Sequence, residues 1–217
     1  MILNIYKPKG ITSFGVVKKI RKIISEKKVG HGGTLDPFAE GVLIIGTGSD
    51  TKKLKKITDT DKTYTASIEL GKITNTLDPE GDVIEKKKIP RLSESKINKV
   101  LKSFLGESMQ TPPMFSAKKI GGVKLYELAR KNIIIDREKA QINISDISLI
   151  SFNETRISFS VSCSKGTYIR VLGKEIAEKL GTVGYLDSLI RTRVGEYFID
   201  DSVSLDQFEL SWKLYAH

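Results

Sequence analysis

The sequence of 217 residues contains one cysteine, two histidines and no long apolar run. Cys163 alone cannot form an internal disulfide or a four-thiolate metal site. No segment approaches the roughly 18 apolar residues of a transmembrane helix, and Lys7-Pro8 comes too early for the apolar core of a signal peptide. We therefore expect a cytoplasmic protein without a membrane segment.

Common catalytic motifs are also missing. A Ser-His-Asp triad would need His31, because His217 is expected to be a frayed terminus, and no GxSxG motif supplies the serine. Ligands for a His/Cys metal site are too few, and neither GxxxxGK[ST] nor GxGxxG is present to bind phosphates. An enzyme with this sequence would use a carboxylate as its reactive group and need no cofactor.

The composition, with 39% hydrophobic and 29% charged residues, is that of a soluble globular protein and excludes a disordered or fibrous chain. The net charge of +10 is unevenly distributed. Residues 1–60 carry 12 basic and 5 acidic side chains, and residues 111–141 carry 7 and 3, whereas residues 142–217 carry 8 and 10. Localised positive charge favours an RNA or DNA partner over a uniformly solvated lysine surface.

Hydrophobic periodicity and turn residues predict an α+β fold with a mixed, largely antiparallel central sheet and flanking helices. A glycine-dense loop is expected at 30–41, and the proline- and glycine-containing segment at about 111–141 is expected to be an excursion from the sheet. The strands are expected at 2–6, 42–45, 63–70 and, as a pair with Cys163 on its apolar face, within 141–164. The helices are expected at 14–26 after a Thr12 or Ser13 cap, at 94–105 before Gly106, and at 169–180 before Gly181; LDPEGDVIE should open a hairpin, and a short tail should end the chain.

The candidate reactive carboxylate is Asp36, in the segment Gly30-His31-Gly32-Gly33-Thr34-Leu35-Asp36-Pro37. Its glycines permit unusual backbone angles and the close approach of a large ligand, and Pro37 fixes the backbone after the carboxylate. A partly desolvated carboxylate needs a fixed cation, for which a guanidinium is well suited. Arg170 and Arg191 are both candidates, and their spacing in the sequence does not choose between them.

The segment GHGGTLDPFAEGVL resembles the signature loop of the TruB family of tRNA pseudouridine synthases, with Asp36 at the family's aspartate. Five further segments resemble family motifs in the family order, so that the resemblance covers about residues 2–208: KPKGITSF, DKTYTASIELGKITNTLDPEGDVI, PPMFSAKKIGGVKLYELAR, CSKGTYIRVLGKEIAEKLG and GYLDSLIRTRVG. The resemblance implies the pseudouridine synthase fold with an RNA-gripping insertion at about 111–141.

The implied activity is the isomerisation of uridine to pseudouridine in the T arm of tRNA, at the position conventionally numbered 55, by base flipping and without a cofactor. The resemblance makes Asp36 the catalytic carboxylate and Arg170 its supporting cation. It also assigns the binding of the target nucleotide to the following four residues: His31, Tyr64, Tyr168 and Leu186.

The sequence departs from the family pattern at Gly32, Ile44, Gly184-Tyr185 and Ile190, which concerns local RNA contacts more than the reaction. We expect 1–217 to be a single catalytic domain without the C-terminal PUA module of many relatives, and a monomer with no obligate protein partner. The alternatives are a non-catalytic tRNA-binding or tRNA-folding module on the same fold, and a basic DNA-binding structural protein.

Overall fold

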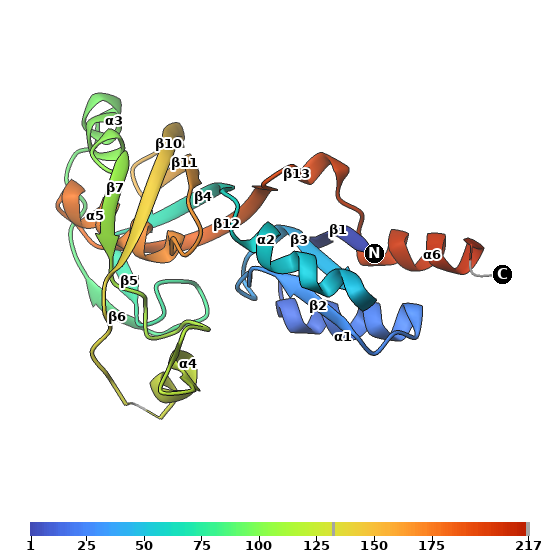
Figure 1. Cartoon of the computed structure of the whole chain (residues 1–217). Coiled ribbons are helices and arrows are strands. Elements are labelled where there is room, and N and C mark those ends of the chain that lie inside the picture. The colour runs from blue at the N-terminus through green and yellow to red at the C-terminus, as the bar shows by residue number, and fades with distance from the viewer. Residues whose placement is uncertain (132, 216–217) are drawn as a thin grey trace. The chain divides into compact units, whose positions relative to one another are not determined.

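The computed structural model describes residues 1–131 and 133–215, which form two compact units (Figure 1). The terminal unit comprises Met1–Tyr64 and Leu189–His217, and the central unit comprises Thr65–Ser188. His217, which was expected to be frayed, lies outside the described residues. Two compact units can be the halves of one domain or two separate domains. The assignment of 1–217 to one catalytic domain therefore stays a prediction.

The terminal unit is built around strand β3. Strand β1 pairs antiparallel with the length of β3; on its other edge, β12 pairs parallel with the start of β3 and β2 pairs antiparallel with its end. The elements are β1 (Ile2–Lys7), α1 (Ser13–Ile24), β2 (Val29–Gly32), β3 (Glu40–Thr47), a 3-10 helix (Gly48–Lys53), α2 (Leu54–Thr58), β13 (Tyr197–Phe198), a 3-10 turn (Ile199–Asp201) and α6 (Leu205–Tyr215).

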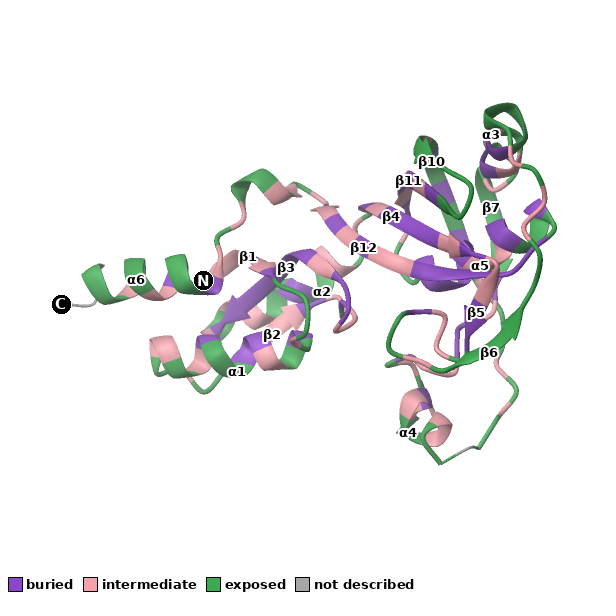
Figure 2. Ribbon diagram, turned by 180° about the vertical axis from the view of Figure 1, so that it is seen from behind, coloured by how far each residue is buried: buried purple, intermediate pink, exposed green. Residues whose placement is uncertain are grey.

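Strand β3 is buried along nearly its whole length, as Figure 2 shows. Leu43 and Ile45 belong to a core cluster that also contains residues of α1 and α6. Val42 and Ile44, which alternate with them and therefore face the other way, pack in a second cluster with Leu54. Burial on both faces explains why this strand reads as a continuous apolar run, and it confirms the predicted strand.

Helix α1 also confirms its prediction. The Thr12 side chain accepts a hydrogen bond from the Gly15 amide at 2.9 Å and so caps the helix, whose apolar residues Val16, Val17 and Ile20 are buried.

Two predictions for the terminal unit were wrong. The start of the expected glycine-dense loop is strand β2. The backbone of Val29–Gly32 pairs with β3, and this pairing does not depend on the side chains. The expected tail contains helix α6, since Leu205 and Phe208 join the core and Trp212 packs against it.

The central unit contains the sheet order β12-β4-β11-β10-β7, in which β10 pairs antiparallel with both β11 and β7. Strands β4 and β12 run from one unit into the other. The elements are β4 (Lys62–Leu70), β5 (Lys72–Thr74), β6 (Val83–Lys86), α3 (Glu94–Lys102), β7 (Gly106–Gln110), β8 (Lys119–Ile120), β9 (Val123–Lys124), α4 (Leu125–Ala129), β10 (Ala140–Phe152), β11 (Arg156–Cys163), α5 (Ile169–Leu180) and β12 (Gly184–Val194).

Most predicted elements of the central unit are confirmed. Strands β10 and β11 form the expected pair and bury Cys163, α5 spans the predicted residues and ends at Gly181 with a φ of 95°, and β5 and β6 form the expected hairpin. Helix α3 is shorter than predicted: Ser103 Oγ binds the Val100 carbonyl at 2.7 Å, and the chain from 106 forms β7 instead.

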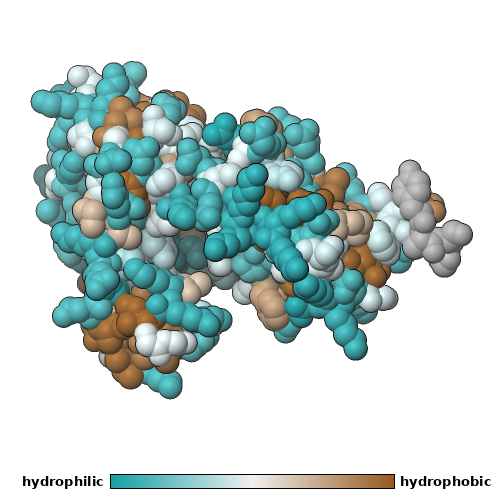
Figure 3. Space-filling view, in the orientation of Figure 1, coloured by the Kyte–Doolittle hydropathy of each residue, from teal (hydrophilic) through white to brown (hydrophobic). Residues whose placement is uncertain are grey.

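The segment at about 111–141 leaves the central sheet as predicted. Strands β8 and β9 form a separate two-stranded sheet followed by the short helix α4. Figure 3 shows apolar surface over α4. Leu125 of that helix is fully buried and is not part of this surface. The fold is therefore α+β with a mixed, mainly antiparallel sheet, as the sequence predicted.

Candidate functional site

Asp36 lies in the connection between β2 and β3, in a segment (33–39) that we call the Asp36 loop. Gly33 has a φ of 80°, a left-handed conformation that favours glycine. At the other end, the Ala39 amide donates to the Asp36 carbonyl at 3.1 Å, which closes a turn with Pro37 at its second position. The rigid backbone expected from the Asp-Pro pair is thus part of a hydrogen-bonded turn.

Ser13, at the start of α1, holds the residue before Asp36. Its buried hydroxyl donates to the Leu35 carbonyl and accepts from the Leu35 amide, both at 2.9 Å. A hydroxyl can do both at once, and this pairing satisfies a backbone segment that has no strand partner here. The serine of the KPKGITSF motif therefore fixes the backbone of the Asp36 loop.

Lys7, at the end of β1, holds the residues after Asp36. Its side chain is fully buried, and its ammonium group donates to the Ala39 carbonyl at 2.6 Å and the Pro8 carbonyl at 2.9 Å. The Gly10 amide adds a bond to the Pro37 carbonyl at 2.9 Å. A buried ammonium is costly unless its donors are satisfied, so Lys7 ties the KPKG turn to the Asp36 loop.

Arg191, in β12, is the third buried side chain that holds this loop. Its Nε donates to the Val42 carbonyl at 2.8 Å and its Nη2 to the Gly33 carbonyl at 3.1 Å. A Cβ on Gly41 would lie 2.3 Å from the Arg191 carbonyl oxygen, so the close pairing of β12 with β3 requires glycine there. Together, Ser13, Lys7 and Arg191 brace the Asp36 backbone from both sides.

His31 and Tyr64 lie in the same unit as Asp36. His31, in β2, has a half-buried side chain; burial lowers its pKa below the ordinary 6.5, and the positive charge of Arg191 lowers that pKa further. Its imidazole is therefore mostly neutral at pH 7. Tyr64, in β4, is buried.

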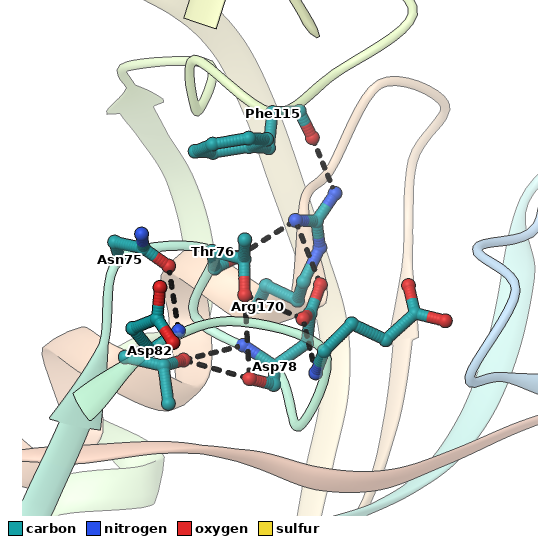
Figure 4. Close-up of polar contacts among 8 residues, drawn as sticks. Asn75, Thr76, Asp78, Asp82, Phe115 and Arg170 are labelled. Carbon is teal, nitrogen blue, oxygen red and sulfur yellow. Dashed lines mark hydrogen bonds and ion pairs between the residues drawn. The ribbon is translucent and has the colours of Figure 1, made fainter. Parts of the chain in front are cut away.

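Arg170, Tyr168 and Leu186 belong to the central unit. Arg170 lies in the first turn of α5 and is 4% exposed, and its Nη1 forms an ion pair with Asp78 at 3.1 Å (Figure 4). The same nitrogen donates to the Thr76 carbonyl at 2.8 Å, and Nη2 donates to the Phe115 carbonyl at 2.7 Å. Residues 74–82 and 115 thereby fix the guanidinium. Its predicted support of Asp36, which lies in the terminal unit, stays a prediction.

Sequence reasoning missed Asp78, which is also 4% exposed. Besides Arg170, its carboxylate accepts from the Thr76 hydroxyl at 2.5 Å and from the Glu80 amide at 3.0 Å. The preceding Leu77 has a φ of 63°, unusual for a branched residue. The signal that could have found this loop is its own Leu-Asp-Pro segment, which repeats the residues around Asp36 and which the sequence analysis treated only as a turn.

Tyr168 and Leu186 are each positioned by their backbone. Gln110, a buried residue of β7 that sequence analysis missed, accepts from the Tyr168 amide at 2.8 Å and donates to the Tyr168 carbonyl at 3.2 Å. The Leu186 amide donates to the Leu77 carbonyl at 3.1 Å. The side chain of Leu186 is fully buried, near Gly173 of α5.

Groups of His, Cys, Asp and Glu side chains that could hold a metal ion are not found within residues 1–131 and 133–215. Over the same residues, none of the helices is both long enough and apolar enough to cross a membrane.

Comparison with known proteins finds that this chain is similar to pseudouridine synthases. The family model of the TruB family pseudouridylate synthase (N terminal domain) matches residues 21–169. The tRNA pseudouridine synthase B of Clostridium tetani is 46% identical over 94% of this chain and 71% of its own length. That of Hydrogenovibrio crunogenus is 43% identical over 99% of this chain and 71% of its own length.

Solved structures agree with this similarity. A chain of a Cbf5-Nop10-Gar1 complex superposes with a TM-score of 0.79 at 28% identity. The match covers all of this chain and 55% of the solved one. A chain from an H/ACA RNP bound to a substrate RNA containing 2'-deoxyuridine gives a TM-score of 0.75 at 26% identity, over 99% of this chain and 54% of that one.

Proposed function

Because the chain belongs to the TruB family of pseudouridylate synthases, we propose that it converts a uridine of tRNA into pseudouridine. The target is the T-arm uridine at the position conventionally numbered 55. Relatives that cover nearly the whole chain are named tRNA pseudouridine synthase B, which supports tRNA as the substrate. The excess of basic residues within 1–60 and 111–141 suits a polyanionic partner.

The reaction is an isomerisation and needs no co-substrate. The bond between uracil N1 and the ribose breaks, the uracil rotates, and a bond forms between its C5 and the same ribose carbon. C5 loses its hydrogen as a proton and N1 gains one, so that atoms and electrons balance within the nucleotide. In our proposal a positioned carboxylate promotes these steps, and a pocket holds the flipped base.

Asp36 supplies that carboxylate in our proposal. The observation that carries it is the bracing of the Asp36 backbone by Ser13, Lys7 and Arg191, which bind backbone amide and carbonyl groups of the Asp36 loop. Such bracing holds a reactive side chain in position during the reaction, and preorganisation of this kind contributes strongly to rate.

Arg170 keeps the Asp36 carboxylate ionised in the proposed complex. A guanidinium has five N–H donors in a planar fork, enough to serve Asp78 and a second carboxylate together. Asp78 acts on the reaction only through Arg170, so it is a positioning residue. This role for Arg170 extends the sequence prediction, and Asp78 explains how the guanidinium is held at the start of α5.

The proposal gives four residues a role in binding the target nucleotide. Tyr64 stacks on the base, Tyr168 and Leu186 line its pocket, and His31 contacts the RNA beside the flipped nucleotide. Extrusion of a base from its stack costs a few kcal/mol, and stacking on an aromatic side chain returns about 1–3 kcal/mol per base. One tyrosine can thus offset much of the cost of base flipping.

The direct test is to incubate an unmodified tRNA transcript with the protein and map pseudouridine along the RNA. We expect product at position 55 and none in a transcript in which that uridine is replaced by cytidine. Binding of the T arm without product after prolonged incubation would instead favour a non-catalytic tRNA-binding module. Equal affinity for duplex DNA and for the T arm at matched salt would argue against both.

A further inference from the structure

A shallow, open pocket of about 720 Å³ lies within the terminal unit, where the end of α1 and the turn after it meet β2 and α2. Figure 3 shows hydrophilic surface over α2 and beside it. The residues that line the pocket are Arg21, Lys27, Lys28, Val29, Gly30, His31, Thr51, Leu54, Lys55 and Thr58. The catalytic assignments above use only His31 from this set.

The lining is rich in positive charge and contains no carboxylate. Four of its side chains are cationic: Arg21, Lys27, Lys28 and Lys55. The neighbouring acidic residue, Glu26, accepts a hydrogen bond from the Lys28 amide at 2.8 Å. Among the described residues, no carboxylate lies within ion-pairing distance of any of the four cations. Such concentrated charge favours an anionic ligand.

Two buried polar atoms of the lining have no partner among the described residues: His31 Nδ1 and Arg21 Nε. The Arg21 guanidinium is nevertheless fixed, because its Nη2 donates to the Val29 carbonyl at 2.9 Å and its Cζ lies 5.7 Å from the centroid of the Phe14 ring. A buried donor without an acceptor is unfavourable, so the fixed Arg21 guanidinium keeps unsatisfied hydrogen-bonding capacity beside the pocket.

The pocket is connected to the Asp36 loop through His31 and Arg191. His31 precedes Asp36 by five residues, and the charge of Arg191 acts on His31 while its Nη2 holds the Gly33 carbonyl. A ligand in the pocket would therefore lie beside the loop that carries the reactive carboxylate. Small molecules are usually bound in pockets that surround them. This pocket is open, so it is better suited to one group of a larger, extended ligand.

We propose that this pocket binds a backbone phosphate of the substrate RNA, on the strand that enters or leaves the flipped nucleotide. A phosphodiester offers only acceptors and matches the ammonium and guanidinium donors of the lining. Arg21 forms the fixed floor, and the exposed Lys28 and Lys55 supply mobile charges at the rim. This proposal rests on the proposed function, because it takes tRNA to be the ligand.

The test uses two exposed rim residues whose loss should leave the fold intact, Lys28→Gln and Lys55→Gln. Lys19→Gln is the matched control, because Lys19 is an exposed lysine of α1 outside the pocket. Affinity for a fluorescent T-arm stem-loop is measured over a range of salt concentrations. We expect each rim variant to lose about 3- to 10-fold in affinity and to reduce the salt slope by about 1, with Lys19→Gln near wild type.

A second measurement identifies the phosphate. Single neutral methylphosphonate linkages are placed in turn along the T-arm RNA. One linkage should weaken binding to the wild type but have little further effect on Lys28→Gln. Unchanged affinity and slope in both rim variants, or an equal loss in Lys19→Gln, would overturn the pocket as a phosphate site. Because both assays measure affinity, pocket-dependent binding without pseudouridine formation would support the pocket and contradict only the proposed function.

Discussion

The tetrapeptide Thr-Leu-Asp-Pro occurs at 34–37 in the terminal unit and again at 76–79 in the central unit, and its aspartate is used differently in each. In the central unit, the carboxylate of Asp78 is almost fully buried and binds Arg170, the Thr76 hydroxyl and the Glu80 amide. In the terminal unit, Asp36 is half-buried, and Ser13, Lys7 and Arg191 brace the backbone around it.

The difference shows that the tetrapeptide supplies the turn, while distant residues decide what its aspartate does. Around Asp78 the carboxylate is itself the centre of the hydrogen-bond network, and the preceding Leu77 has a left-handed φ of 63°. Around Asp36 the bonds of Ser13, Lys7 and Arg191 hold the main chain that carries the proposed reactive carboxylate. We therefore expect replacement of Asp78 to cost stability and replacement of Asp36 to cost activity.

The largest effect on stability is expected from Asp78→Ala. Removal of one partner of a buried ion pair costs about 3–5 kcal/mol, and here Arg170 loses the carboxylate that binds its Nη1. Urea unfolding followed by circular dichroism measures this, with Asp82→Ala, an exposed aspartate of the same loop, as the control. A loss no greater than that of Asp82→Ala would break the proposed distinction between the two aspartates.

A smaller loss of stability is expected from Arg191→Met, which keeps the bulk but removes the donors to Val42 and Gly33. The buried Val42 carbonyl and the partly buried Gly33 carbonyl lose these donors, at a cost of about 2–4 kcal/mol. Relative to wild type, amide hydrogen exchange should accelerate more in the Asp36 loop than in β10. Uniform acceleration over both regions would show that Arg191 stabilises the fold in general and not this loop in particular.

Ser13→Ala should cost less, about 1–3 kcal/mol, because it leaves the Leu35 amide and carbonyl without their partner. It should also slow the reaction at saturating tRNA, since the Asp36 backbone is less restrained. The control is Thr12→Ala, which removes the cap of α1 at a cost of about 1 kcal/mol. Equal reaction rates for the two variants would mean that the Ser13 contact does not position Asp36.

The smallest effect is expected from His31→Gln and concerns pH. The pKa of His31 is lower in the folded protein than the ordinary 6.5, so the unfolded chain binds the proton more readily. The associated stability is complete above pH 6.5 and is lost as the pH falls through the folded-state pKa. Thermal unfolding between pH 7 and pH 5 should therefore be less pH-dependent in His31→Gln, and an unchanged dependence would contradict the shift.

Much of the fold could be predicted because local patterns and tertiary packing agree there. Helices α1 and α5 have apolar faces and terminal signals, and β3 is a continuous apolar run. Strand β2 was missed because its glycines carry no side-chain pattern and only pairing with β3 defines it. Helix α6 was missed although Leu205, Phe208 and Trp212 follow helical spacing, a signal that was present in the sequence.

The site was less predictable than the fold. Asp36 stood out by its glycine-rich, proline-fixed surroundings, and the resemblance to the family supplied its proposed partners. The buried braces Lys7, Ser13 and Arg191 were not identified as such, because their contacts join segments that are far apart in the chain. Neither was the Arg170–Asp78 pair, since many aspartates are equally compatible with an arginine partner when only spacing is considered.

The most direct test of the central claim, that Asp36 is the reactive carboxylate, is hydrogen release from a T-arm RNA labelled with tritium at uracil C5. Wild-type protein should release the label as pseudouridine forms. Asp36→Asn, which keeps the size and the braced backbone, should bind the RNA with similar affinity, remain folded and release no label above background. Undiminished release by Asp36→Asn would contradict the account.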